Sequence, residues 1–184
     1  NQVEPVDEVC YSRCIRLAYG RKNVRRVIML NIKPLTLFIA TILVYVPFHV
    51  FEEAAGNFPL FMHENWGIPD IGYARWLFHN IALFVPVLVT GLFVFSLDEE
   101  RLLPFGVGIT LWGVMNFCEH LFYTIRNVRV SPGTFSALLF VVVALLLSVK
   151  LKQMNRLNPK TIGLSIVCAL VYWALPIALI IILS

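Results

Sequence analysis

The sequence predicts an all-α, polytopic membrane protein, a bundle of five transmembrane helices with a cytoplasmic N-terminal arm. Of its 184 residues, 59% are hydrophobic and 14% are charged, whereas soluble domains average roughly 45–50% and 25%. Five apolar stretches are long enough, or nearly so, to cross a hydrocarbon core of about 30 Å at about 1.5 Å per helical residue. These stretches are 34–55, 75–97, 102–125, 132–150 and 161–184.

Short connections join the stretches, so neighbouring helices should run antiparallel within one transmembrane domain, 34–184. The preceding segment, 1–33, is basic with scattered apolar positions, which is typical of an amphipathic arm on a membrane surface. Most of the 15 lysines and arginines lie in this arm or in the second and fourth connections. The positive-inside rule then predicts a cytoplasmic N-terminus and an external C-terminus.

The net charge of +4 reflects this asymmetry and does not indicate a nucleic-acid-binding protein. Basic residues beside a membrane span usually contact anionic lipid headgroups. We therefore expect membrane lipids as partners and no nucleic acid. The four cysteines give no disulfide framework, because Cys10 and Cys14 lie in the cytoplasmic arm and the others lie inside predicted helices.

A group of ionisable residues closes the first span. His49, Glu52 and Glu53 follow one another at i, i+3 and i+4, so they share one helix face within an arc of about 100°. Ionisable residues at bilayer depth are costly and by default mark a functional site that faces the bundle interior. Tyr45 lies one turn earlier on this face, where it either lines the same pocket or simply packs.

Two further spans place polar residues at a similar depth. Asn116, Glu119 and His120 of the third span repeat the same offsets, and His79 lies near the outer end of the second. From the inner helix ends, His49 is about 22 Å up and the Asn116 group about 21–27 Å up. In a core of about 30 Å these residues all fall in the outer third, so we expect them to line one pocket.

The connection 56–70 alternates turn-forming residues with aromatic ones. This composition favours a loop that rests in the outer membrane interface. Such a loop would either cover the pocket as a lid or seat the bundle in the membrane.

His49-Val50-Phe51-Glu52-Glu53 resembles the motif after which the HXXEE membrane proteins are named. The resemblance extends through Asn116 and His120 to Ser131-Pro132-Gly133. That family has a suspected active site without an assigned reaction, so the resemblance implies an enzyme but not its chemistry. The pattern is not that of zinc proteases, because no second histidine follows His49 at i+4.

Glutamates gathered in an apolar pocket require a cation, a protonated histidine or shared protons. Imidazole with carboxylate suits zinc or iron, so the leading hypothesis is a membrane metalloenzyme acting on a lipid or isoprenoid. Its expected ligands are His49, His79, His120, Glu119 and one of the two adjacent glutamates, Glu52 and Glu53. We take Glu53 as that ligand. The other glutamate would be the general base for a metal-bound water. The candidate catalytic residues are Glu52, Glu53, His49, Asn116 and Tyr45.

Two alternatives remain open at this level. The first is a metal-free isomerase or cyclase of a sterol-like or polyprenyl lipid, and the five-span layout is similar to that of emopamil-binding sterol isomerases. Glutamate and histidine would then transfer protons, while Tyr45 and Trp112 stabilised a carbocation. The second is a transporter or lipid-binding protein whose buried charges carry protons or bind a headgroup.

Overall fold

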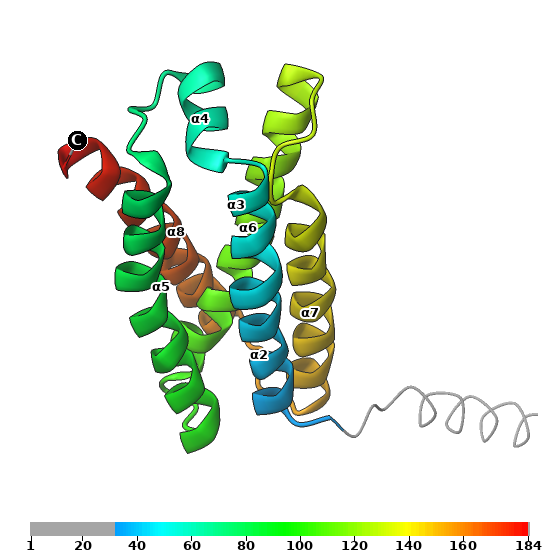
Figure 1. Ribbon diagram of the computed structural model, residues 1–184. Coiled ribbons are helices and arrows are strands. Elements are labelled where there is room, and N and C mark those ends of the chain that lie inside the picture. Colours follow the sequence, from blue (N-terminus) through cyan, green and yellow to red (C-terminus); the bar gives the residue numbers. More distant parts are fainter. Residues whose placement is uncertain (1–31, 184) are drawn as a thin grey trace, which may run out of the picture. The chain divides into compact units, whose positions relative to one another are not determined.

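The computed structural model of this protein describes residues 32–183, which are helical and contain no strand. The predicted arm, 1–33, lies almost wholly outside the described residues. The helices, in order along the chain, are α2 (Pro34–Leu43), η1 (Val44–His49), α3 (Val50–Ala55), α4 (Phe58–Trp66), α5 (Gly72–Leu97), α6 (Leu103–Asn127), α7 (Thr134–Gln153) and α8 (Pro159–Leu183) (Figure 1). The predicted all-α class is therefore confirmed for this part of the chain.

Four of these helical segments are long and apolar enough to cross a membrane: Pro34–Ala55, Gly72–Leu97, Thr134–Gln153 and Pro159–Leu179. The fifth predicted span, 102–125, forms α6 but is not among them. Helix α6 packs against α5, α7 and α8, so much of its surface faces other helices. Its polar residues can therefore point into the bundle while its neighbours supply the apolar exterior.

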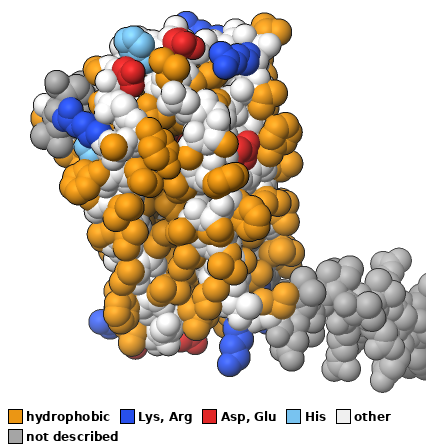
Figure 2. Space-filling view, in the orientation of Figure 1, with side chains coloured by type: hydrophobic (Ala, Val, Ile, Leu, Met, Phe, Trp, Pro, Cys, Tyr) orange, Lys and Arg blue, Asp and Glu red, His pale blue; other side chains and the backbone are white. Residues whose placement is uncertain are grey.

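Close packing around α6 depends on small residues. A Cβ atom on Gly108 would lie 2.6 Å from Cys168 Cβ of α8, and one on Gly113 would lie 2.9 Å from Phe140 Cβ of α7. Glycine at such positions lets helix backbones approach closely. Large apolar side chains also cover the outside of the bundle, and Figure 2 shows them over the middle of the visible face with most charges toward its ends. This distribution suits contact with lipid.

The first span contains a π-helical turn. Proline at position 47 predicts a kink near Leu43, and the π-helix η1 begins at the next residue, Val44. At the end of η1 the backbone N–H of Val50, the first residue of α3, donates to the carbonyl of Tyr45, five residues earlier. The turn ends at His49, the first residue of the predicted site. Single π turns of this kind occur frequently at functional sites.

The loop expected over 56–70 is wrong in part, because Phe58–Trp66 forms the nine-residue helix α4. Asn57 and Gly67, both in the left-handed conformation with φ of 49° and 64°, bound this helix. A small apolar cluster holds it against α6: Phe61, Met62 and Tyr123. Burying these apolar side chains stabilises the helix, and this free energy outweighs the preference of the surrounding glycines and prolines for a loop.

Candidate metal centre

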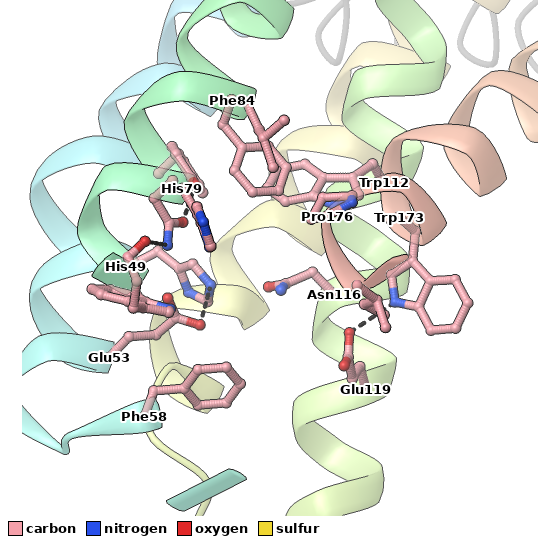
Figure 3. Close-up of a pocket in the computed structure, with 15 residues that line it drawn as sticks. His49, Glu53, Phe58, His79, Phe84, Trp112, Asn116, Glu119, Trp173 and Pro176 are labelled. Atoms are coloured by element: carbon pink, nitrogen blue, oxygen red, sulfur yellow. Dashed lines mark hydrogen bonds and ion pairs between the residues drawn. The ribbon is translucent and has the colours of Figure 1, made fainter. Parts of the chain in front are cut away.

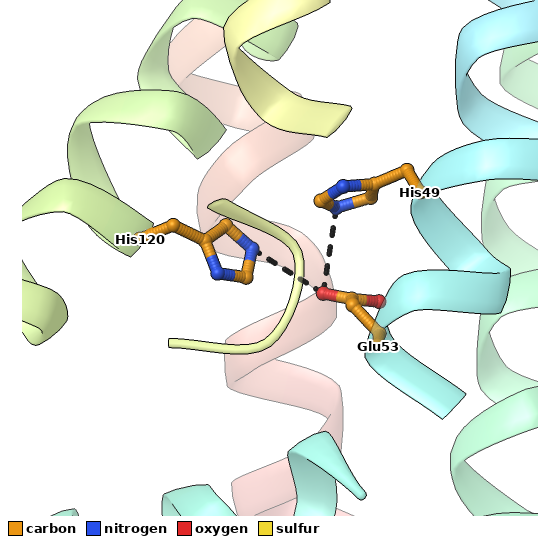
Figure 4. A group of neighbouring side chains, drawn as sticks. All are labelled: His49, Glu53 and His120. Atoms are coloured by element: carbon orange, nitrogen blue, oxygen red, sulfur yellow. Dashed lines mark ion pairs between the residues drawn. The ribbon is translucent and has the colours of Figure 1, made fainter. Parts of the chain in front are cut away.

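Three buried side chains from separate elements converge near one end of the bundle. His49 ends η1, Glu53 lies on α3 and His120 lies on α6. Nε2 of His49 is 3.4 Å from Oε1 of Glu53, and Nε2 of His120 is 3.3 Å from the same oxygen (Figure 4). The three ligand atoms all lie within 4.8 Å of one another. We refer to these residues as the His–Glu–His group.

A serine hydroxyl forms a hydrogen bond with the other ring nitrogen of each histidine. Ser136 Oγ lies 3.0 Å from His49 Nδ1, and Ser131 Oγ lies 3.0 Å from His120 Nδ1. The Ser136 hydroxyl donates to the carbonyl of Gly133 at 3.2 Å, which leaves its oxygen able to accept from His49 Nδ1–H. In that tautomer His49 Nε2, the nitrogen nearer Glu53, is available to bind a metal. Metal-binding histidines are oriented by such hydrogen bonds at their second nitrogen.

The distances within the group fit a shared cation. Charge-assisted N–H···O bonds are usually about 2.7–2.9 Å long, so 3.3 and 3.4 Å are long for direct pairing. Two ligands bound at about 2.05 Å to a tetrahedral ion are about 3.3 Å apart. The His–Glu–His group could therefore hold a metal ion without rearrangement of these two pairs.

The turn between α6 and α7 closes over the group, and Figure 4 shows it passing beside the three side chains. Gly133 in this turn has φ of 98°, a conformation that favours glycine. A Cβ atom there would lie 2.7 Å from His120 Cε1, 2.9 Å from His49 Cε1 and 3.0 Å from Glu53 Cγ. The turn therefore fits against the group only because residue 133 lacks a side chain.

Glu52 and Glu53, which the sequence leaves unresolved, have different positions. Glu53 is buried in the His–Glu–His group, whereas Glu52 reaches the N-terminus of α7. Its carboxylate accepts the backbone N–H of Phe135 at 3.1 Å and that of Ser136 at 2.7 Å. These N–H groups have no partner within their own helix, and a negative charge is favourable there. Glu52 therefore fixes the helix turn that carries the Ser136 partner of His49.

We expect Glu52→Ala to destabilise the bundle by about 1–2 kcal/mol, because two N–H groups of α7 lose their acceptor. Thermal unfolding in detergent would measure this as a lower midpoint. Glu52→Gln should lose less, since its amide oxygen can still accept from Ser136 N–H. An unchanged midpoint in Glu52→Ala would contradict the capping role.

A cavity of about 110 Å³ borders the group, with His49 and Glu53 on one wall. Asn116, His79 and Glu119 line other parts of it, and Figure 3 shows the Asn116 amide directed across the space. Asn116 Oδ1 and His79 Nδ1 are buried atoms without a hydrogen-bond partner among the described residues. The predicted pocket thus brings these side chains together, but His79 lies outside the His–Glu–His group.

Glu119, another predicted ligand, has partners of its own. Tyr123 donates its hydroxyl to Glu119 Oε1 at 2.5 Å, and Trp173 donates Nε1–H to Oε2 at 2.8 Å. Because both oxygens are engaged, Glu119 stands on the cavity wall as part of a separate hydrogen-bonded set. The sequence gives no local sign of the Trp173 contact, which joins α8 to α6.

Tyr45 does line the cavity, as the sequence allowed. Its hydroxyl donates to Asn80 Oδ1 at 2.6 Å, and its ring lies 5.4 Å from that of Trp112 between centroids. Asn80 also donates to the Trp76 carbonyl of its own helix at 3.0 Å. Asn80 was not predicted as a site residue, because a single asparagine in an apolar helix has no distinctive spacing.

Comparison with protein-family models, curated proteins and solved structures finds no match for this chain. The function proposed below therefore rests on the geometry and chemistry of the chain's own residues.

Proposed function

We propose that this protein is an integral membrane metalloenzyme that acts on a lipid or isoprenoid substrate. The observation that carries the proposal is the convergence of two histidine Nε2 atoms on one buried carboxylate oxygen, with a serine at each Nδ1. Two histidines and one carboxylate hold zinc in several hydrolases and iron(II) in non-haem oxygenases. Zinc and iron are therefore the candidate metals.

A bound metal would supply Lewis acidity and an activated water. The chain's own groups would position the substrate, because Asn116 and His79 line the cavity and their Oδ1 and Nδ1 atoms have no hydrogen-bond partner among the described residues. Glu52, one of the two glutamates considered as general base, instead binds the N-terminus of α7. We therefore assign proton transfer to His79, which lines the same cavity and whose Nδ1 has no hydrogen-bond partner among the described residues.

The proposal places all five long helical segments across the membrane, with the N-terminus in the cytoplasm and the site in the outer half. The contacts of α6 with α5, α7 and α8 support its inclusion as a span, since these neighbours would supply the surface that faces lipid. The residues that carry the HXXEE resemblance also gather at one place: His49, Glu53, His120, Ser131 and Gly133. This gathering supports membership of that family.

Metal-free acid–base chemistry on an isoprenoid is the second candidate, and the aromatic wall of the cavity favours it. The aromatic residues that line the cavity include Tyr45, Trp76, Phe84, Trp112 and Trp173. Ring faces stabilise a developing carbocation through cation–π contact. Glu53, between two histidines, would then transfer a proton to or from the substrate.

Metal content separates the two candidates. We expect protein purified in detergent without a histidine tag to contain about one equivalent of zinc or iron by mass spectrometry. His49→Ala and His120→Ala should lose it, because each removes a ligand. His63→Ala is the matched control, since His63 is exposed and bonds to the Ile68 carbonyl outside the site. Metal-free protein from metal-replete cells would exclude the metalloenzyme and favour acid–base chemistry.

A further inference from the structure

A second cavity, of about 150 Å³, lies beside the first. Four residues line both cavities, so the two cavities adjoin along a shared wall: Phe58, Trp76, Glu119 and Ile177. The rest of the second cavity comes from α4, the segment after it, and α6: Pro59, Met62, Ile68, Pro69, Ile71 and Tyr123. The ring of Phe58 also lies 5.1 Å from that of His120 between centroids, so the shared wall borders the His–Glu–His group.

The two cavities differ in the polar atoms they offer to a ligand. The first is lined by Glu53 and by His79 and Asn116, each of which has a buried polar atom without a hydrogen-bond partner among the described residues. In the second, the ionisable side chains are Glu119 and Tyr123, and these bond to each other at 2.5 Å. Trp173 satisfies the other oxygen of Glu119. The second cavity is therefore apolar toward any ligand that enters it.

We propose that the site takes a single-chain amphiphile whose small polar end has a metal-binding oxygen. The polar end lies in the first cavity, and the hydrocarbon chain passes Phe58 and Trp76 into the second cavity beneath α4. An apolar cavity of about 150 Å³ holds a ligand the size of benzene, so the second cavity receives about six carbons of the chain. This inference rests on the proposed metal site and adds the form and orientation of its substrate.

Alkyl hydroxamates test the proposal, because their polar end chelates divalent metals and their chain length can be varied. We would titrate acetohydroxamate, hexanohydroxamate and decanohydroxamate into metal-loaded, full-length protein by calorimetry at one detergent concentration. Affinity should rise about fourfold for each methylene that enters the apolar cavity. The affinity should level off once about six carbons have entered the second cavity and filled it.

Tryptophan substitutions separate binding in the cavity from partition into detergent. Ile68→Trp and Met62→Trp fill the second cavity and should remove most of the gain with chain length, while acetohydroxamate still binds. Leu60→Trp is the matched control, because Leu60 lies on α4, as Met62 does, but is 37% exposed and lines neither cavity. Retained metal and retained acetohydroxamate affinity report that each variant is folded.

An equal dependence on chain length in the wild type and both filled variants would overturn the proposal, since the chain would then not occupy the second cavity. Failure of acetohydroxamate to bind the wild-type protein would instead overturn the metal site, and the amphiphile proposal with it. The two failures are distinct, because the first leaves binding of the short hydroxamate intact.

Discussion

Replacing Gly133 by alanine is expected to abolish metal binding and to lower the stability of the bundle by about 2–5 kcal/mol. The new Cβ atom would approach both histidine rings and Glu53 to within 2.7 to 3.0 Å, and overpacking of this kind costs about 1–3 kcal/mol. A φ of 98° adds about 1–2 kcal/mol for a residue with a side chain. Metal content and thermal unfolding would measure the two effects.

Gly67→Ala provides the matched control for this variant. Gly67 also has a positive φ, 64°, but a Cβ atom there would meet nothing within 4 Å. It should therefore lose about 1 kcal/mol through backbone strain alone and retain its metal. If Gly133→Ala bound metal as the wild type does, the turn would not be packed against the ligands as described.

The second large effect is expected for Glu53→Gln, which should lower metal affinity more than about 100-fold. Loss of an outer-shell partner usually lowers affinity about 10–100-fold, and among residues 32–183 Glu53 is the carboxylate that both histidines pair with. Glutamine keeps the shape of the side chain, so the bundle should remain folded. Competition with a chelator of known affinity would measure the change.

Glu52→Gln is the comparison that makes this test specific. The two glutamates are adjacent in sequence, but Glu52 contacts the backbone of α7 and not the histidines. Glu52→Gln should therefore leave the metal affinity within about tenfold of wild type. Equal losses in the two variants would show that overall charge, rather than direct ligation by Glu53, controls metal binding.

The positions of the long helices could be predicted from the sequence, because a membrane-spanning helix requires a long run of apolar residues. The first predicted span, 34–55, coincides with the observed segment Pro34–Ala55. Helix α4 was missed because Gly56, Pro59, Gly67 and Pro69 surround or interrupt its apolar residues. Those residues suggest a loop locally, and only the contacts of α4 with α6 reveal a helix.

The site was predictable only in part. Spacing and depth indicated that His49, Glu53 and His120 would share a pocket, and the structure brings them together. The orientation of Glu52 against Glu53 could not be read from spacing, because the two differ by one helix position and follow a π turn. The serine partner of His49 was hidden for another reason. Ser136 lies 87 residues from His49 in the sequence, and no local pattern reports such a contact.

That separation also orders the steps by which the protein can mature. Ribosomes add roughly 5–20 residues per second, so about 4–17 s pass between synthesis of His49 and of Ser136, 87 residues later. For most of this time His49 and Glu53 exist without His120, and the Gly133 turn and the first turn of α7 are synthesised only at its end. The nascent first span therefore holds only part of the ligand set. If the group binds the proposed metal, loading would wait until α6 and α7 are in place and would be a late event in biogenesis.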